Sequence, residues 1–237
     1  MSRRRADRMN RMSDSTAKVS NTELIKAVRV SGEEADRKLS GTHEAREKVL
    51  TQSRQIVRYS ANSIRATHRR DYEEAHQLIA SAAELRSKLE IERQEHPSVY
   101  FGGYVEDALK EYVEAHATLA FAEGSRLPTM SDLNVSAAVY MNGLAESVGE
   151  LRRLVLDLLR GDDFARCESF LEIMDEIYSV LVTLDYPDGV TRGLRRTTDV
   201  MRGVIERTRG DITVALRQRR LEGQLLELNR RISSSRS

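Results

Sequence analysis

A short stretch of the sequence gathers carboxylates at a spacing that could hold a metal ion. Asp107, Glu111, Glu114 and Thr118 follow one another at intervals of three and four residues. At about 100° per residue, these side chains fall within about 60° of one another on one side of a helix. Oxygen ligands of this kind suit Mg²⁺ or Mn²⁺ better than zinc. An acidic face turned to water has the same pattern, and spacing alone favours that simpler interpretation.

A second polar stripe follows on the next long helix that the sequence predicts. It comprises Asn142, Glu146, Glu150, Arg153 and Asp157, opposite the apolar face of the same segment. These side chains fall within about 80° of one another. A stripe that lines a water-filled cavity and one that faces bulk water look identical in sequence. Spacing alone again favours the ordinary polar surface.

An arginine stripe could contact phosphates. Arg54, Arg58, Arg65 and Arg69 lie on one side of a predicted helix, within about 60° of one another. Guanidinium groups bind phosphate oxygens in a bidentate manner, and such a row can follow a nucleic-acid backbone. An ordinary basic helix face is an equally good interpretation.

Other chemistry is poorly supported. The single cysteine, Cys167, excludes a disulfide framework and a cysteine-based zinc site. There is no phosphate-binding glycine loop, nucleophile elbow or His-Glu-x-x-His motif. Glu73 and His76 match one half of a di-iron carboxylate motif, but that chemistry needs a second copy. No apolar run approaches the ~18–20 residues that a membrane helix needs.

Charge is unevenly distributed along the 237 residues. The formal net charge is only +1, yet residues 1–12 carry five Arg and one Asp, and residues 217–237 carry six Arg and two Glu. Basic ends on an acidic body can contact polyanions, although solvated tails are equally compatible. With one cysteine and no secretory signal at the first methionine, we expect a cytoplasmic protein.

The elements that must position these residues are long helices. Pro97, Pro128 and Pro187 fall between stretches of helical periodicity, and no stretch alternates with period two. We predict an all-α bundle of six or seven mostly long antiparallel helices. The domain organisation is a basic, disordered tail over 1–20, a helical domain over 21–216 and a basic helical extension with a tail over 217–237. The expected helices cover about 20–30, 33–69 after a break at Ser31 and Gly32, 72–94, 98–121, 133–160, 163–184 and 190–230.

Three segments resemble the translin family, and specifically its translin-associated protein X type. Residues 108–115 (ALKEYVEA) resemble that type's LQEYVEA segment. Residues 143–153 (GLAESVGELRR) are similar to its G-x-A-D-L-x-G-E-L-x-R segment, and residues 44–69 resemble its long first helix. The order and spacing of these segments extend the resemblance over about residues 33–216.

The resemblance implies a fold of about seven helices that assembles into a closed octamer around nucleic acid. It implies a Mg²⁺- or Mn²⁺-dependent endoribonuclease of single-stranded RNA, with single-stranded DNA as a further ligand. Carried over by position, the catalytic and metal-binding residues are Glu111, Glu114, Glu146 and Glu150. We expect nucleic acid to contact the four arginines above together with Arg153.

Two points bear on activity. Translin itself has Arg and an aromatic residue where this chain has Glu111 and Glu114, which favours the catalytic type. The catalytic type, however, has Asp where this chain has Glu146, and the extra methylene could move a bound metal ion. The alternative is a translin-like protein that binds single-stranded RNA or DNA without cutting it.

Overall fold

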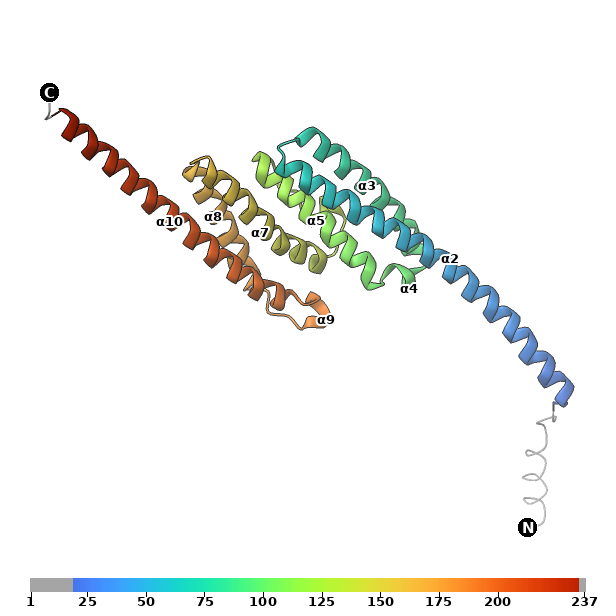
Figure 1. The fold of residues 1–237 in the computed structure, drawn as a ribbon. Helices are drawn as coiled ribbons and strands as arrows, with labels where there is room; N and C mark the ends of the chain where they lie inside the picture. Colours follow the sequence, from blue (N-terminus) through green and yellow to red (C-terminus); the bar gives the residue numbers. More distant parts are fainter. Residues whose placement is uncertain (1–18, 235–237) are drawn as a thin grey trace, which may run out of the picture. The chain divides into compact units, whose positions relative to one another are not determined.

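The computed structural model describes residues 19–234, and within this range it contains helices and no strand. Six helices are long and three are single turns. The bounds are α2 (Asn21–His68), α3 (Tyr72–Glu95), α4 (Pro97–Tyr100), α5 (Gly103–Glu123), α6 (Met130–Leu133), α7 (Ala137–Arg160), α8 (Phe164–Leu181), α9 (Asp188–Thr191) and α10 (Leu194–Ser234) (Figure 1). The prediction of an all-α fold is confirmed. The predicted tail over 1–20 lies almost entirely outside the described residues.

The chain divides into two compact units, residues 1–46 and 47–237. Among the described residues, the first unit comprises 19–46, which is the N-terminal part of α2. All packing and all sites described below belong to the second unit.

The predicted break at Ser31 and Gly32 is wrong, because α2 is one helix from Asn21 to His68. A single glycine costs a helix only about 1 kcal/mol, which its neighbours offset. Conversely, the helix predicted from residue 98 is divided into α4 and α5 by Phe101 and Gly102. A Cβ at Gly102 would lie 2.6 Å from the Tyr104 ring, so a larger residue at this turn would require the ring to move.

Side chains at the helix ends explain where the chain turns. Asp71 caps α3 by accepting a hydrogen bond from the backbone N–H of Glu74. Gly161 ends α7, and Asp163 caps α8 by accepting from the backbone N–H of Arg166. Gly124 ends α5 in the left-handed conformation, with φ of 73°.

The core is built around α7, which contacts α5, α8 and α10. Asn142 is buried at the start of α7, so this first member of the predicted polar stripe does not face water. Its amide donates to the carbonyl of Thr191, and its oxygen accepts from the hydroxyl of Thr197. The residues of α5 and α7 that fill the core include Val105, Leu109, Tyr112, Val148, Leu151 and Val155.

No helix within residues 19–234 is long and apolar enough to cross a membrane.

Candidate metal and nucleic-acid site

Two carboxylates from each predicted stripe line one cavity of about 540 Å³. Helices α5 and α7 pack against each other, and α10 packs against α7 (Figure 1). The acidic stripe of α5 therefore faces that of α7, and the beginning of α10 closes the cavity. Its charged lining residues are Lys110, Glu111, Glu114, Glu146, Glu150 and Arg196.

Three carboxylates converge at the centre of this cavity. One oxygen from each of Glu111, Glu114 and Glu146 lies within 4.8 Å of the others. Two of these residues come from α5 and one from α7, so only helix packing brings them together. Oxygen atoms from three carboxylates at this separation suit a hard divalent cation such as Mg²⁺ or Mn²⁺. The residues present therefore fit the metal that the family resemblance implies.

The electrostatics of the site show that negative charge is in excess. Burial, together with the charges of Glu111, Glu146 and Glu150, raises the pKa of Glu114 to about 8. Burial and the charge of Glu146 also raise the pKa of Glu111. The protein alone therefore keeps a proton on Glu114 at neutral pH. A cation bound among these oxygens would displace that proton.

Two cationic groups that the sequence analysis did not select reach the same site. The first is Lys110, whose ammonium lies 2.9 Å from a carboxylate oxygen of Glu146. Burial alone lowers the pKa of Lys110, but the hydrogen bond and charge of Glu146 outweigh this effect, and the pKa is raised. Lys110 was overlooked because it lies beside, rather than on, the acidic stripe of its helix. The second is Arg196, which lines the cavity from the start of α10.

Glu150 is held by His68, the last residue of α2. Nε2 of His68 contacts a carboxylate oxygen of Glu150, and the imidazole is almost fully buried. This hydrogen bond is the main cause that lowers the pKa of Glu150, against the opposing effect of burial. Glu150 lines the cavity but is not among the three converging carboxylates. His68 follows Arg65 at helical spacing, yet nothing local in the sequence connects it with a residue far along the chain.

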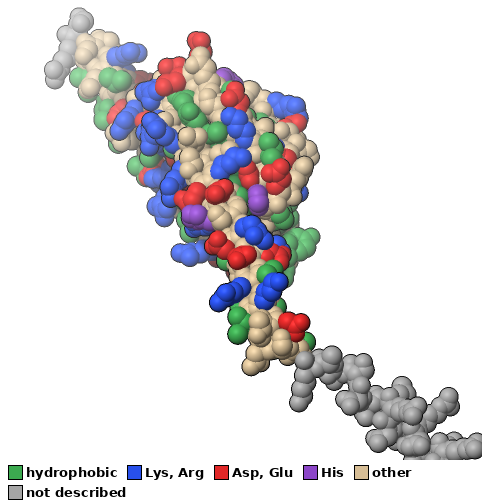
Figure 2. All heavy atoms as spheres, turned by 90° about the vertical axis from the view of Figure 1, so that its right-hand side faces the viewer, with side chains coloured by type: hydrophobic (Ala, Val, Ile, Leu, Met, Phe, Trp, Pro, Cys, Tyr) green, Lys and Arg blue, Asp and Glu red, His purple; other side chains and the backbone are tan. Residues whose placement is uncertain are grey.

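The predicted nucleic-acid residues are exposed but lie on different elements. Arg54, Arg58 and Arg65 are exposed on α2, and Arg69 is exposed directly after its end. Arg69 forms an ion pair with Glu74. Arg153, exposed on α7, lies close enough to Glu150 for its charge to lower the pKa of that carboxyl. On the face drawn in Figure 2, basic and acidic side chains are interspersed.

A second group of metal-ligand side chains occurs at the end of α3. It consists of Glu92, Glu95 and His96. The buried carboxylate of Glu92 is already paired with the ammonium of Lys48. Glu95 is exposed, and no other observation points to a ligand at this group, so we assign it no metal.

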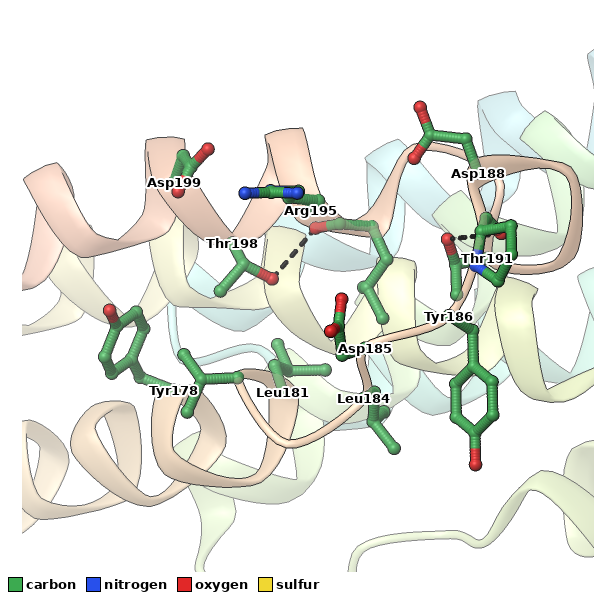
Figure 3. Close-up of a pocket in the computed structure, with 13 residues that line it drawn as sticks. Tyr178, Leu181, Leu184, Asp185, Tyr186, Asp188, Thr191, Arg195, Thr198 and Asp199 are labelled. Atoms are coloured by element: carbon green, nitrogen blue, oxygen red, sulfur yellow. Dashed lines mark hydrogen bonds between the residues drawn. The ribbon is translucent and has the colours of Figure 1, made fainter.

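A larger cavity, about 810 Å³, lies between the segment that joins α8 to α9 and the start of α10 (Figure 3). Asp185, Arg195 and Asp199 are among its lining residues. The hydroxyl of Thr198 in its wall donates to the carbonyl of Leu194, at 2.8 Å. Neither group of converging metal-ligand side chains found among the described residues belongs to this cavity.

The fold and the acidic cavity define an all-helical protein of the translin-like class. No family model matches the chain. An uncharacterised protein of Methanocaldococcus jannaschii, MJ0175, is 30% identical over 188 residues, covering 79% of this chain and 83% of that protein. AfC3PO, which has a crystal structure, shares 39% sequence identity with this chain. The two structures match with a TM-score of 0.74 over 79% of this chain and 97% of AfC3PO. The chain belongs to this translin-like C3PO family.

Two further solved structures add to this comparison. AfC3PO has also been solved as a complex with duplex RNA, and that structure matches with the same identity, coverage and TM-score. Apo-NeC3PO is 20% identical with a TM-score of 0.69, and the match covers 84% of this chain and 99% of that one. This last likeness supports the fold alone.

The raised pKa of Glu114 predicts a pH-dependent stability in the absence of metal. The pKa rises from 4.5 to about 8 on folding, so between these values the folded protein binds a proton that the unfolded chain has released. Stability therefore falls as pH rises through this window. A shift of this size corresponds to at most about 4–5 kcal/mol. We expect about 1–2 kcal/mol because solvent reaches this half-buried site.

Glu114→Gln should remove this dependence. In EDTA, urea unfolding at pH 5 and pH 8.5 should show the variant gaining about 1–2 kcal/mol relative to wild type at the higher pH. Exposed Glu84 on α3 provides the matched control, because Glu84→Gln should leave the pH dependence unchanged. Parallel pH profiles for wild type and Glu114→Gln would contradict the assignment.

Proposed function

We propose that this chain is a metal-dependent endoribonuclease that acts on single-stranded RNA inside a homo-oligomer. The observation that carries the proposal is the convergence of Glu111, Glu114 and Glu146 within 4.8 Å. The resemblance of the two helices to the catalytic type of the translin family supports the same conclusion. A divalent ion bound there would activate a water molecule and stabilise negative charge on the phosphate.

The residues of the chain have distinct roles in this proposal. Glu111, Glu114 and Glu146 would hold Mg²⁺ or Mn²⁺, with Glu114 as the ionised carboxylate. Glu150 is the fourth carboxylate, and its contact with His68 fixes the orientation of its oxygens. Arg153 beside Glu150, together with the arginine stripe, contacts phosphates of the strand.

One observation favours the non-catalytic alternative. Lys110 already pairs with Glu146, so part of the negative charge is neutralised without a metal ion. A site neutralised by its own lysine could bind RNA or single-stranded DNA without cutting it. In the catalytic proposal, the carboxylate of Glu146 would hold the divalent ion in addition to its contact with Lys110.

The test is a cleavage assay with purified full-length protein. Labelled single-stranded RNA and duplex RNA are incubated with Mn²⁺, with Mg²⁺ or with EDTA. Both strand forms are needed because AfC3PO has been solved with duplex RNA. Cleavage of the single strand that requires the divalent ion supports the proposal. Tight binding of RNA without any cleavage in Mn²⁺ would favour the non-catalytic alternative.

Assembly is part of the same proposal, because a cavity that encloses RNA needs several subunits. We expect a homo-octamer. Light scattering at micromolar concentration should give about eight times the chain mass of 26.9 kDa. A stable monomer under these conditions would be incompatible with a closed chamber.

The arginine stripe predicts a salt-dependent affinity. If each arginine neutralises one phosphate, the logarithm of the affinity for single strands should fall with the logarithm of salt concentration, with a slope of about −0.7 per contact. Replacing Arg54 and Arg58 with Gln should reduce this slope by about 1.4. Filter binding across a salt series measures it.

Lys88, an exposed residue of α3, is the control for this experiment. Lys88→Gln removes a positive charge from a different helix and should leave the slope unchanged. Equal slopes for wild type and the double arginine variant would exclude phosphate contacts by Arg54 and Arg58.

A further inference from the structure

The C-terminal part of α10 extends past the helices against which α10 packs. Ile212 is the last buried residue of this helix, and every residue from 216 to 234 is exposed. The helix nevertheless continues to Ser234, as Figure 1 shows. An isolated helix of this length is marginal in water, so the extension gains its order from the folded part of α10 or from a partner.

The extension carries a heptad pattern of apolar residues. Val214, Leu221 and Leu228 are seven residues apart, and Leu225 and Ile232 are also seven residues apart. Gln218 precedes Leu225 at the same spacing. The two sets alternate at intervals of four and three, as the a and d positions of a coiled coil do. The five apolar side chains are between 45% and 65% exposed.

This apolar seam lies on a different face from the one that packs against the body of the protein. Arg219 forms an ion pair with Asp162, at 2.8 Å, and its guanidinium lies 5.4 Å from the centre of the Phe164 ring. These contacts hold the start of the extension against the turn between α7 and α8. At about 100° per residue, Arg219 points about 130° away from the centre of the seam. The seam is therefore directed away from the contact that anchors it.

We propose that residues 214–232 form a parallel two-stranded coiled coil with the same segment of a second copy of this chain. The seam is self-complementary because every apolar residue would meet its own counterpart. Val214, Leu221 and Leu228 occupy d positions, and Gln218, Leu225 and Ile232 occupy a positions. A single polar residue at an a position, here Gln218, is a feature that fixes the register of such pairs. This interaction does not depend on the proposed nuclease activity.

The charges beside the seam favour the parallel arrangement. Arg217 occupies a g position and Glu222 the following e position. In a parallel pair, Arg217 of one chain lies beside Glu222 of the second copy, and the two charges attract. An antiparallel pair that joined the same apolar residues would place Arg217 near Arg231 of the second copy, so like charges would repel. These charges therefore favour the parallel direction over the antiparallel one.

The comparison with AfC3PO leaves part of this chain unmatched. AfC3PO is matched over 97% of its own length but over only 79% of this chain. About a fifth of this chain thus has no counterpart there.

Disulfide trapping in the full chain tests the proposal. Gln218→Cys places a thiol at a seam position, whereas Arg220→Cys places one two residues away, on the outer side of the helix. The native Cys167 is buried, and burial raises its pKa to about 11, so it should not compete. Under mild oxidation at about 10 µM protein, we expect Gln218→Cys to form a two-chain band at least ten times faster than Arg220→Cys.

A pair of adjacent leucines provides the matched control. Leu225 lies in the seam and Leu226 outside it, and both are more than half exposed. In the Gln218→Cys background, Leu225→Glu should suppress the two-chain band at least tenfold, while Leu226→Glu should leave it unchanged. Because neither leucine is buried, neither change should prevent folding.

Three outcomes would overturn the proposal. Equal trapping of Gln218→Cys and Arg220→Cys would indicate random encounter, and equal effects of the two leucine variants would exclude the seam. Absence of a two-chain band would exclude the parallel pair, and the face would then be free or covered by another segment of the chain or by RNA. An antiparallel pair would also keep the two introduced thiols apart and give no band.

Discussion

Glu114→Gln is expected to reduce RNA cleavage at least about 100-fold while leaving assembly intact. Gln has nearly the same size as Glu but cannot carry the negative charge that a divalent ion requires. A loss of this order is usual when a group that organises charge at the reacting phosphate is removed. RNA binding should be unchanged, because Glu114 without metal already carries a proton at neutral pH and the Gln amide is likewise uncharged. Cleavage and filter binding in Mn²⁺ are measured side by side.

The pH profile adds a second criterion to this prediction. Glu114 must lose its proton to bind the ion, and its pKa without metal is about 8. At a fixed, subsaturating Mn²⁺ concentration, wild-type cleavage should therefore rise as pH increases towards about 8. The residual activity of Glu114→Gln should lack this component.

Glu123 is the matched control on the same helix. It lies at the end of α5 and contacts His76, at 3.0 Å, outside the cavity. Glu123→Gln should cut RNA at the wild-type rate. If Glu114→Gln cuts equally fast, Glu114 is not a metal ligand and the non-catalytic alternative becomes the better account.

The sequence predicts the helices and the face on which each carboxylate lies. Helical periodicity is local, so the spacing of Glu111 and Glu114 suffices to place them on one side of α5. The prediction that Glu146 and Glu150 face the same site depends on which helices pack together. The family resemblance supplied that information, and spacing alone favoured a solvated surface.

The charged neighbours of the carboxylates could not be predicted from the sequence. His68 and Glu150 are 82 residues apart, and Lys110 and Glu146 are also on different helices. Side-chain partners of this kind follow from tertiary packing, which no local pattern encodes. The predicted helix break at Ser31 and Gly32 is wrong for the opposite reason. The local cost of a single glycine is too small to interrupt a helix that continues on both sides of it.

A close approach of α5 and α7 holds the carboxylates together, and Gly143 makes this approach possible. A Cβ at Gly143 would lie 2.6 Å from the carbonyl oxygen of Lys110 and 2.7 Å from the Cβ of Val113. Because one of these atoms belongs to the backbone of α5, the helices must separate to accommodate a larger residue. Lys110 directly precedes Glu111, so any separation also moves the acidic cluster.

We therefore expect Gly143→Ala to lower the free energy of unfolding by about 1–3 kcal/mol, as overpacking usually does. It should also weaken Mn²⁺ binding, measured by calorimetry. Gly149, on the same helix, has nothing within 4 Å of the place its Cβ would occupy. Gly149→Ala should stabilise the protein by about 0.5–1 kcal/mol, since alanine favours a helix. Opposite signs for these two substitutions would show that the packing of α5 on α7 requires glycine at 143. If both variants were stabilised alike, the close approach would not constrain this position.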